Sequence, residues 1–467
     1  MSFTLASVKR GSEFDVSLSE AYDREEGIGA IAHQTRVTEH NDSSRGEDKM
    51  KYAIWIVRFW YAGWMIPAGL EHFVHIYPQP GYYTTIPLQH ETLFAFLHSH
   101  LFDVVKAVEM LTGIAVLLGF YTPLMLLVCM PVAFCVFWWD APLSMWNWGS
   151  VVAGGRVLAS NVLLSVALIS CYRPMFPLRS KPQALSAAST ERTATSPAMQ
   201  QLVLVGRSIF GAWMLIGGAN YFFFSLWPVP TGHAPLAIEL MGAFSHSGLL
   251  GVAMLIQLVT GALILTGVFA PAALCVVMPT STCALYWALL EHQPLPLALA
   301  LVAFALNGLL MLAYFGYYTG ALRRSALTLG ESGHATTWDT LFVNHKGRTS
   351  REHFIAALIP LAIVVWFYTH SGPNQYALWA VLVLLFPAVV LHARRLHDIG
   401  HSGWLLLLPV ILTVAAMAIW DRLLYLGARL NFAVPLAALI VFVGFSLWGC
   451  IVKGRAEANT FGPPAMS

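Results

Sequence analysis

The chain has 467 residues, of which 57% are hydrophobic and only 11% are charged, and its mean hydropathy is +0.64. Soluble domains carry about 25% charged residues, so this composition excludes an ordinary soluble globule and predicts an all-α, polytopic integral membrane protein. The formal net charge of +2 is too small to indicate nucleic acid as a partner.

The first 50 residues are polar and charged, without the apolar stretch of a signal peptide. We expect them to form a disordered tail on the cytoplasmic side. Beyond the tail, apolar runs long enough to cross a bilayer recur along the chain, and each predicts a transmembrane helix. About twelve such runs occur, at 52–75, 101–119, 122–140, 149–171, 202–226, 248–268, 270–290, 295–318, 352–370, 374–393, 403–420 and 432–452.

Lys and Arg are distributed unevenly between the two sides that these spans imply. About twenty of the 26 basic residues fall in the tail, in two long linkers, and at the same-side ends of the last spans. The opposite loops hold only Arg422 and Arg429. Because cytoplasmic loops carry the excess of basic residues, both termini are predicted to be cytoplasmic. The four remaining basic residues lie within or at the ends of predicted helices: Arg58, Lys106, Arg156 and Arg207.

An internal repeat occupies the first two thirds of the predicted spans. The segment 58–65 (RFWYAGWM) matches 207–214 (RSIFGAWM), and Gly, Pro, Cys and Trp positions further on match at the same offset of 148 or 149 residues. We therefore predict a duplicated four-helix unit whose copies lie parallel, since each has an even number of spans. The predicted domains are a tail at 1–50, a first unit at 51–173, a linker at 174–200, a second unit at 201–320, a linker at 321–345 and a third four-helix unit at 346–464.

Each copy of the repeat resembles the DoxX-like family of small four-helix membrane proteins. The resemblance rests on an Arg at the start of the first helix, here Arg58, a Gly-rich first span, and a second helix that carries Lys106 and Glu109 at the Lys and Glu positions of a K-x-x-E pattern. It implies a link to membrane-associated sulfur or thiol oxidation through quinones. The second copy has Met254 and Gln257 at these two places, so any function of the Lys/Glu pair would be lost there.

Residues from about 338 to 464 resemble the YhaH-type inner-membrane family, domain-of-unknown-function family 805. Three motifs agree in order: GRTSREHF at 347–354, RRLHDIGHSGW at 394–404 and NTFGPP at 459–464. The resemblance implies a four-helix domain of the bacterial cytoplasmic (inner) membrane and no known reaction.

The first unit has the polar residues that a ligand site would need. The ligand-binding candidates are Arg58, Glu71, His72, Asp103, Lys106 and Glu109. The last three follow one another at helical spacing on one face, which could hold a quinone carbonyl or relay a proton, and quinone is the one candidate cofactor. Alternatively, Lys106 reaches the outer interface and pairs with Asp103 or Glu109 to fix helix packing. Neither the histidines nor the six cysteines show tight ligand spacing, so no metal site is predicted.

A second set of candidates lies on the predicted cytoplasmic side. It comprises Arg348, Arg351, Arg394, Arg395, His397, Asp398, Gly400, Gly403 and Trp404. Because charge is costly inside a bilayer, the block 394–404 is predicted to be a short loop at the membrane face. Arg394 and Arg395 would lie at the level of anionic headgroups, with Asp398 in reach of an Arg or His. A structural lock is the favoured interpretation, and a binding site for a lipid headgroup or a partner is the alternative.

These observations favour an integral cytoplasmic-membrane protein that acts as a membrane subunit or scaffold for a redox or stress-related partner. The alternative is a quinone-linked oxidoreductase component that uses the polar face of the first unit. A small-molecule permease is the third hypothesis, but it would need polar residues near mid-membrane in both copies, and the second copy is poor in them. The expected partners are the lipid bilayer and a membrane or redox protein, and no catalytic residue is assigned.

Overall fold

The computed structural model describes residues 52–75, 84–182, 197–323, 341–371, 374–426, 428–463 and 465, and leaves out the side chains of 371–378 and 417–436. Over these residues the secondary structure is helical, apart from one isolated bridge between Asn459 and Gly462. The all-α prediction is therefore confirmed for the described part of the chain. The predicted tail, the middle of both predicted linkers, and the side chains of Arg422 and Arg429 lie outside the described residues.

The first unit begins with a helix at 52–74. It continues with α2 (Pro87–His98), α3 (Leu101–Leu118), α4 (Thr122–Asp140), α5 (Trp148–Ala167), the short α6 (Ile169–Tyr172) and the 3-10 turn η2 (Arg173–Met175). Local chemistry sets the ends of these helices. Gly119 ends α3 in the left-handed region at φ 75°, Pro123 occupies the first turn of α4, and the Asn147 side chain caps the start of α5.

The second unit repeats this order. Its elements are α7 (Pro197–Ala219), the π-helical turn η3 (Asn220–Phe224), α8 (Pro235–His246), α9 (Leu249–Thr266), α10 (Ala270–Glu291), α11 (Pro294–Ala313) and the 3-10 turn η4 (Phe315–Tyr317). Gly267 and Pro271 form the turn between α9 and α10, as Gly119 and Pro123 do between α3 and α4. The same turn chemistry thus gives the same helical hairpin in both units.

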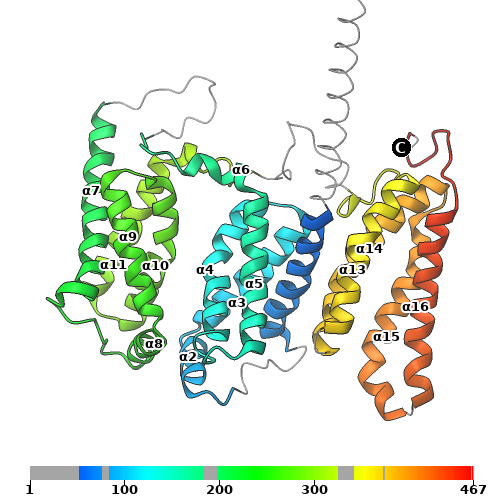
Figure 1. Ribbon diagram of the computed structural model, residues 1–467, viewed down its shortest axis with the longest axis horizontal. Helices are drawn as coiled ribbons and strands as arrows, with labels where there is room; N and C mark the ends of the chain where they lie inside the picture. The colour runs from blue at the N-terminus through cyan, green and yellow to red at the C-terminus, as the bar shows by residue number, and fades with distance from the viewer. Residues whose placement is uncertain are drawn as a thin grey trace, which may run out of the picture. The chain divides into compact units, whose positions relative to one another are not determined.

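Two short helices, α2 and α8, were not predicted from the sequence. Each begins at a Pro and has 12 residues, too few to cross a bilayer. They lie at the same end of the long helices (Figure 1) and pack against each other. Helix α2 also has weak apolar patterning and therefore resembled a loop between spans.

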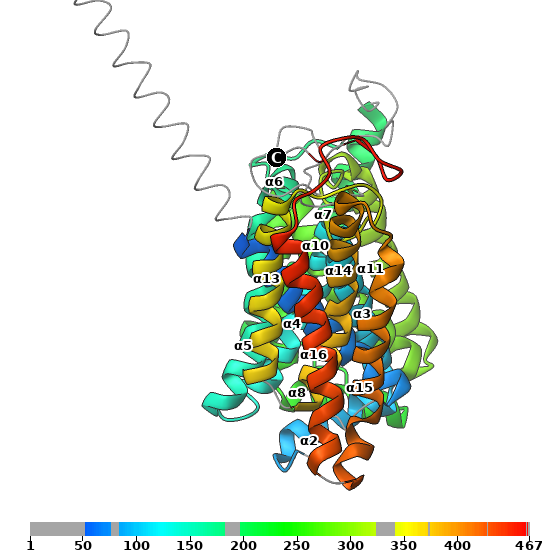
Figure 2. The same cartoon turned by 90° about the vertical axis from the view of Figure 1, so that its right-hand side faces the viewer.

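The C-terminal domain consists of α13 (Arg351–Ser371), α14 (Asn374–Ile399), the 3-10 turn η5 (Gly403–Leu406), α15 (Leu407–Leu426) and α16 (Ala428–Ile451), which run side by side in Figure 2. Its core continues into the helix at 52–74. There Trp55 and Phe59 pack against Phe342. The Tyr368 hydroxyl of α13 donates to the backbone carbonyl of Trp60 at 2.5 Å, and the two rings stack.

Among the described residues, eight helices are long and apolar enough to cross a membrane. They indicate a membrane protein. Helix α3 is not among the eight because it carries Asp103, Lys106 and Glu109. The described residues of α15 and α16 contribute shorter apolar stretches at 403–416 and 437–451. The count of about twelve spans therefore stays a prediction.

Equivalent contacts recur in the two units at the offset of the sequence repeat. The Trp139 indole donates to the Gln89 carbonyl at 3.3 Å, and the Trp287 indole donates to the Ala237 carbonyl at 3.0 Å. Both members of the second pair lie 148 residues after their counterparts. Similar sequences thus make the same helix-to-helix bonds, as expected of a duplicated unit.

The contacts between the units are reciprocal. His98 Nδ1 lies 2.8 Å from Glu239 Oε1, and His246 Nδ1 lies 2.7 Å from Glu91 Oε1. His246 is the repeat equivalent of His98, and Glu239 is the repeat equivalent of Glu91. Reciprocal contacts of this kind resemble those between two subunits related by a two-fold axis. The same exchange relates Trp138, which donates to the Ser247 carbonyl, and Tyr286, which donates to the Ser99 carbonyl.

Candidate functional site

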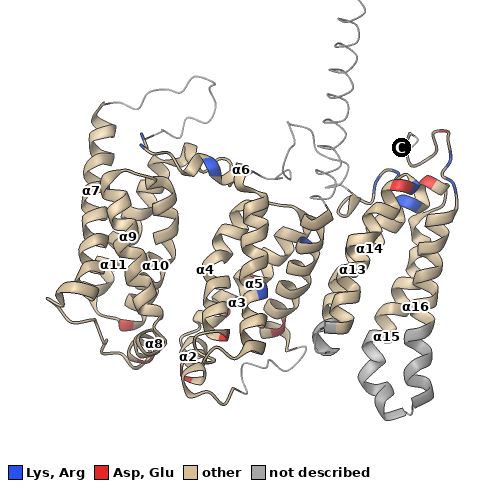
Figure 3. Ribbon diagram, in the orientation of Figure 1, with Lys and Arg blue, Asp and Glu red and all other residues tan. Residues whose placement is uncertain are grey.

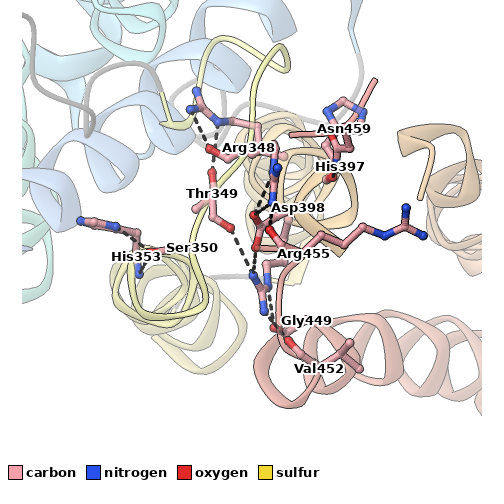
Figure 4. Close-up of polar contacts among 12 residues, drawn as sticks. Arg348, Thr349, Ser350, His353, His397, Asp398, Gly449, Val452, Arg455 and Asn459 are labelled. Atoms are coloured by element: carbon pink, nitrogen blue, oxygen red, sulfur yellow. Dashed lines mark hydrogen bonds and ion pairs between the residues drawn. The ribbon is translucent and has the colours of Figure 1, made fainter. Parts of the chain in front are cut away.

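Three motifs that are far apart in the sequence meet at one end of the C-terminal domain. Arg348 precedes α13, Asp398 lies in the last turn of α14, and Arg455 follows α16 (Figure 4). Arg348 donates to the backbone carbonyl of Arg455, and Asn459 donates to that of His397 at 2.9 Å. Figure 3 shows that the charged residues in the described part of this domain gather at the same end. The bonds join the loop before α13, the end of α14 and the chain after α16.

Asp398 is buried and pairs with two arginines. Its Oδ1 accepts from Arg348 Nε at 3.0 Å, and its Oδ2 accepts from Arg395 Nη1 at 2.5 Å. The Asp398 side chain is 5% exposed and both arginine side chains are 1% exposed. Because water is excluded, each charge depends on its partners for compensation. Removing the carboxylate would leave two buried guanidinium groups without an ionic partner.

The cluster contains more buried positive than negative charge: three arginines against one aspartate in the described part of the domain. Backbone carbonyls accept hydrogen bonds from the guanidinium groups and so stabilise the excess positive charge. Arg395 Nε donates to the Gly449 carbonyl at 2.8 Å, and Arg395 Nη2 donates to that of Val452. These acceptors lie at the C-terminal end of α16, where carbonyls lack helical partners and the helix dipole is negative. Arg395 therefore caps α16 from the side.

The prediction of a loop at 394–404 is wrong for the first half of that range. Helix α14 continues to Ile399, past the predicted end at 393. The Arg394 and Arg395 residues are 8% and 1% exposed, so their side chains do not face lipid headgroups. Arg394 instead donates to the Thr349 hydroxyl at 3.1 Å and to the Asn344 carbonyl at 3.2 Å. The helix can continue through these charges because the protein itself provides their partners.

His397 and Gly400 close the cluster on its other side. The His397 ring stacks on Phe461 with centroids 4.0 Å apart, and its Nδ1 lies 3.2 Å from the Gly347 carbonyl. Gly400 ends α14 with φ at +92°, where the Arg455 side chain occupies the space that a Cβ would need. The three motifs thus meet in a packed structure.

The remaining predicted residues of this set lie outside the buried cluster. A Cβ on Gly403 would meet the Cβ of Ala393 at 3.1 Å, so this glycine permits a close approach to α14. Trp404 is 77% exposed. Arg351 is exposed at the first residue of α13. Together with three other exposed basic residues it forms the basic rim, which consists of Lys346, Arg351, Lys453 and Arg455.

The predicted polar face of the first unit divides into two groups. Near the start of α3, Asp103 Oδ1 lies 2.7 Å from His72 Nε2 and its Oδ2 lies 3.0 Å from His100 Nδ1. Further along α3, Lys106 Nζ donates to Glu109 Oε2 at 2.8 Å, and these side chains are 12% and 4% exposed. Of the two partners considered for Lys106, the structure therefore selects Glu109.

Arg58 and Glu71, the other candidates of the first unit, differ in their hydrogen bonding. Arg58 donates two hydrogen bonds to the Val116 carbonyl, at 2.8 and 3.1 Å, and its guanidinium lies 4.2 Å from the Trp55 ring centroid. It therefore ties the first helix to the end of α3. Glu71 is 2% exposed, and its Oε2 has no hydrogen-bond partner among the described residues. A buried carboxylate oxygen without a partner is costly and marks a candidate site.

Sequence reasoning missed a buried polar chain in the same unit. The Asn161 amide donates to the Tyr61 hydroxyl at 3.1 Å, and this hydroxyl donates to Cys129 Sγ at 3.3 Å. All three residues are buried. One signal was available, because Asn161 recurs as Asn307 in the equivalent apolar helix of the second unit. Among the described residues, no group of three or more His, Cys, Asp or Glu could hold a metal ion.

Comparison with known proteins identifies the C-terminal domain. Residues 342–463 match the family model DUF805, described as a protein of unknown function. The match confirms the predicted resemblance of this part of the chain. The matched range contains the first two motifs and all but the last residue of the third. No curated protein and no solved structure matches the chain.

Proposed function

We propose that the chain is a multi-pass protein of the bacterial cytoplasmic membrane that acts as a membrane subunit or scaffold for a redox or stress-related partner. In this proposal two DoxX-like units precede the DUF805 domain, and about twelve spans leave both termini in the cytoplasm. The excess of basic residues on one side supports the orientation, and the recurring contacts of the two units support the duplication.

The proposed orientation can be tested with reporter fusions. Fusions after residues 145, 230 and 425 are expected to report the outer side, because the loops there lie opposite the basic linkers. An alkaline phosphatase reporter active only outside, paired with a green fluorescent protein active only inside, would measure this. A cytoplasmic signal at 230 would contradict the proposed order of the two units.

The observation that carries the scaffold proposal is the contrast between inner and outer charges of the DUF805 domain. Asp398 and its arginine partners bond within the domain and hold three segments together. The basic rim adds exposed positive charge before and at the start of α13 and after α16, whereas Glu352 and Glu457 are the exposed acids nearby in sequence. A basic surface on segments that are bonded together suits docking of an acidic partner protein, whose encounter it would steer.

Charge reversal of the rim tests the scaffold proposal. Lys346→Glu combined with Lys453→Glu is expected to lower the recovery of specific partners from native membranes by about tenfold or more, since rim charges set association. Quantitative mass spectrometry of cross-linked, affinity-purified protein provides the measurement. The matched control is Arg179→Glu with Lys181→Glu, two exposed basic residues outside the DUF805 domain. Equal recovery for both double variants would refute a partner at the rim.

A second candidate function is a quinone-linked redox component in the first unit. It is favoured by Glu71, whose buried Oε2 has no partner among the described residues, and by the buried Lys106–Glu109 pair. Both groups could exchange protons with a ligand that is reduced and protonated. Protein purified in mild detergent should then yield quinone on solvent extraction in near-equimolar amount. Extracts with only trace quinone, from membranes rich in it, would remove this candidate.

A further inference from the structure

Arg156 is a charged residue in the interior of α5, a helix long and apolar enough to cross a membrane. It lies eight residues after Trp148 in α5, about 12 Å along the helix and close to its midpoint. Within the described part of the chain, no carboxylate lies within 4.0 Å of its guanidinium. A charge at such depth without a counter-ion is costly, and residues of this kind are retained for a ligand or an ion.

The guanidinium lies in aromatic surroundings. It contributes to a pocket between α5 and the helix at 52–74, whose walls include Trp60, Trp64 and Ser160. From α13, the Phe367 ring lies with its centroid 6.0 Å from the Arg156 Cζ. The pocket has a volume of about 30 Å³, more than a single water needs, so it admits a small head group.

The second unit shows that the four-helix architecture does not need this arginine. Asn161 and Asn307 are equivalent and both fully buried. Tyr172 and Tyr318 are also equivalent, and their hydroxyls make the same helix-packing contact in the two units. These two pairs are each 146 residues apart, and this offset aligns Arg156 with Val302, which is 54% exposed on α11. An apolar residue thus serves at this place in the second unit. The packing within the four-helix unit therefore does not require the charge of Arg156.

We propose that Arg156 binds the carboxylate of an acyl-chain amphiphile, such as a fatty acid, that reaches the pocket from the bilayer. The planar guanidinium fork matches two carboxylate oxygens, and one positive charge balances one negative charge. A phosphate monoester carries up to two charges, but no second cation lines the pocket. A phosphodiester has its charge between two substituents, whereas a carboxylate ends its chain and can enter a small pocket head first. The aromatic walls and the surrounding bilayer accommodate the acyl chain.

A photoreactive fatty acid with a diazirine near its carboxylate tests this proposal on the full-length protein in phosphatidylcholine nanodiscs. Cross-links mapped by peptide mass spectrometry are expected in the helix at 52–74 and in α5. Arg156→Val, which installs the residue of the second unit, and Arg156→Gln should each lower labelling by at least about tenfold, since a charge-assisted hydrogen bond is lost. Arg156→Lys should retain part of it. The matched control, Val302→Ala, should label like the wild type.

Competition on the wild-type protein distinguishes the two sources of an anionic head group. Unlabelled oleate should displace the probe, whereas phosphatidylglycerol at the same mole fraction should not. Displacement by phosphatidylglycerol as strong as by oleate would overturn the carboxylate assignment in favour of a phosphate. Undiminished labelling of well-folded Arg156→Val would overturn the site itself. The competition experiments use only the wild-type protein, so they still test the proposal if the variants fail to fold.

Discussion

Replacing Asp398 by asparagine is expected to destabilise the DUF805 domain by about 3 to 5 kcal/mol. Its carboxylate compensates Arg348 and Arg395, whose side chains are each 1% exposed. Asparagine keeps the size of the side chain but not its charge, so the two guanidinium groups stay buried without an ionic partner. The expected result is a lower apparent melting temperature of the detergent-purified protein, followed by intrinsic fluorescence, and faster proteolysis near residue 398 in inside-out vesicles.

Insertion into the membrane should be unaffected by this change, because apolar helices elsewhere hold the chain in the bilayer. Resistance to carbonate extraction would show this. The matched control is Glu352→Gln, which removes an exposed carboxylate from the first turn of α13 and should change stability by no more than about 0.5 kcal/mol. If Asp398→Asn melts and resists protease as the wild type does, the carboxylate is not a structural lock.

Lys106→Met alone is expected to destabilise the first unit by about 3 to 5 kcal/mol, because it leaves the 4% exposed Glu109 side chain without its partner. Adding Glu109→Gln should restore most of the loss. The double variant has the Met and Gln that the second unit has at Met254 and Gln257, so the packed four-helix unit accepts this pair. Removing both members of a buried pair is often close to neutral.

A double-mutant cycle on apparent unfolding free energies measures the coupling, which we expect to reach up to about 3 kcal/mol. Additive effects of the two single changes would mean that Lys106 and Glu109 do not depend on each other. The same double variant separates the two proposed functions. A scaffold should still recover its partners with Met and Gln in place, whereas a quinone-linked component should lose its extractable quinone.

Local signals in the sequence predicted most helices within a few residues. The turn from Gly119 to Pro123 and its equivalent from Gly267 to Pro271 each end one helix and begin another, because a left-handed glycine and an N-terminal proline act through the local backbone. Pairing of Arg395 with Asp398 was also accessible, since their i, i+3 spacing follows from helical geometry. The short helix α2 was missed because its apolar patterning is weak.

The sequence by itself determined the all-α class, the internal repeat and the C-terminal family, because hydropathy, turn residues and motifs are properties of contiguous chain. The tertiary structure decided which charges meet. Arg348 reaches Asp398 across 50 residues, and Arg395 reaches the carbonyls that end α16. It likewise brought His72 of the first helix to Asp103 of α3. Such pairings depend on how helices approach one another in space, and sequence spacing has no information about that distance.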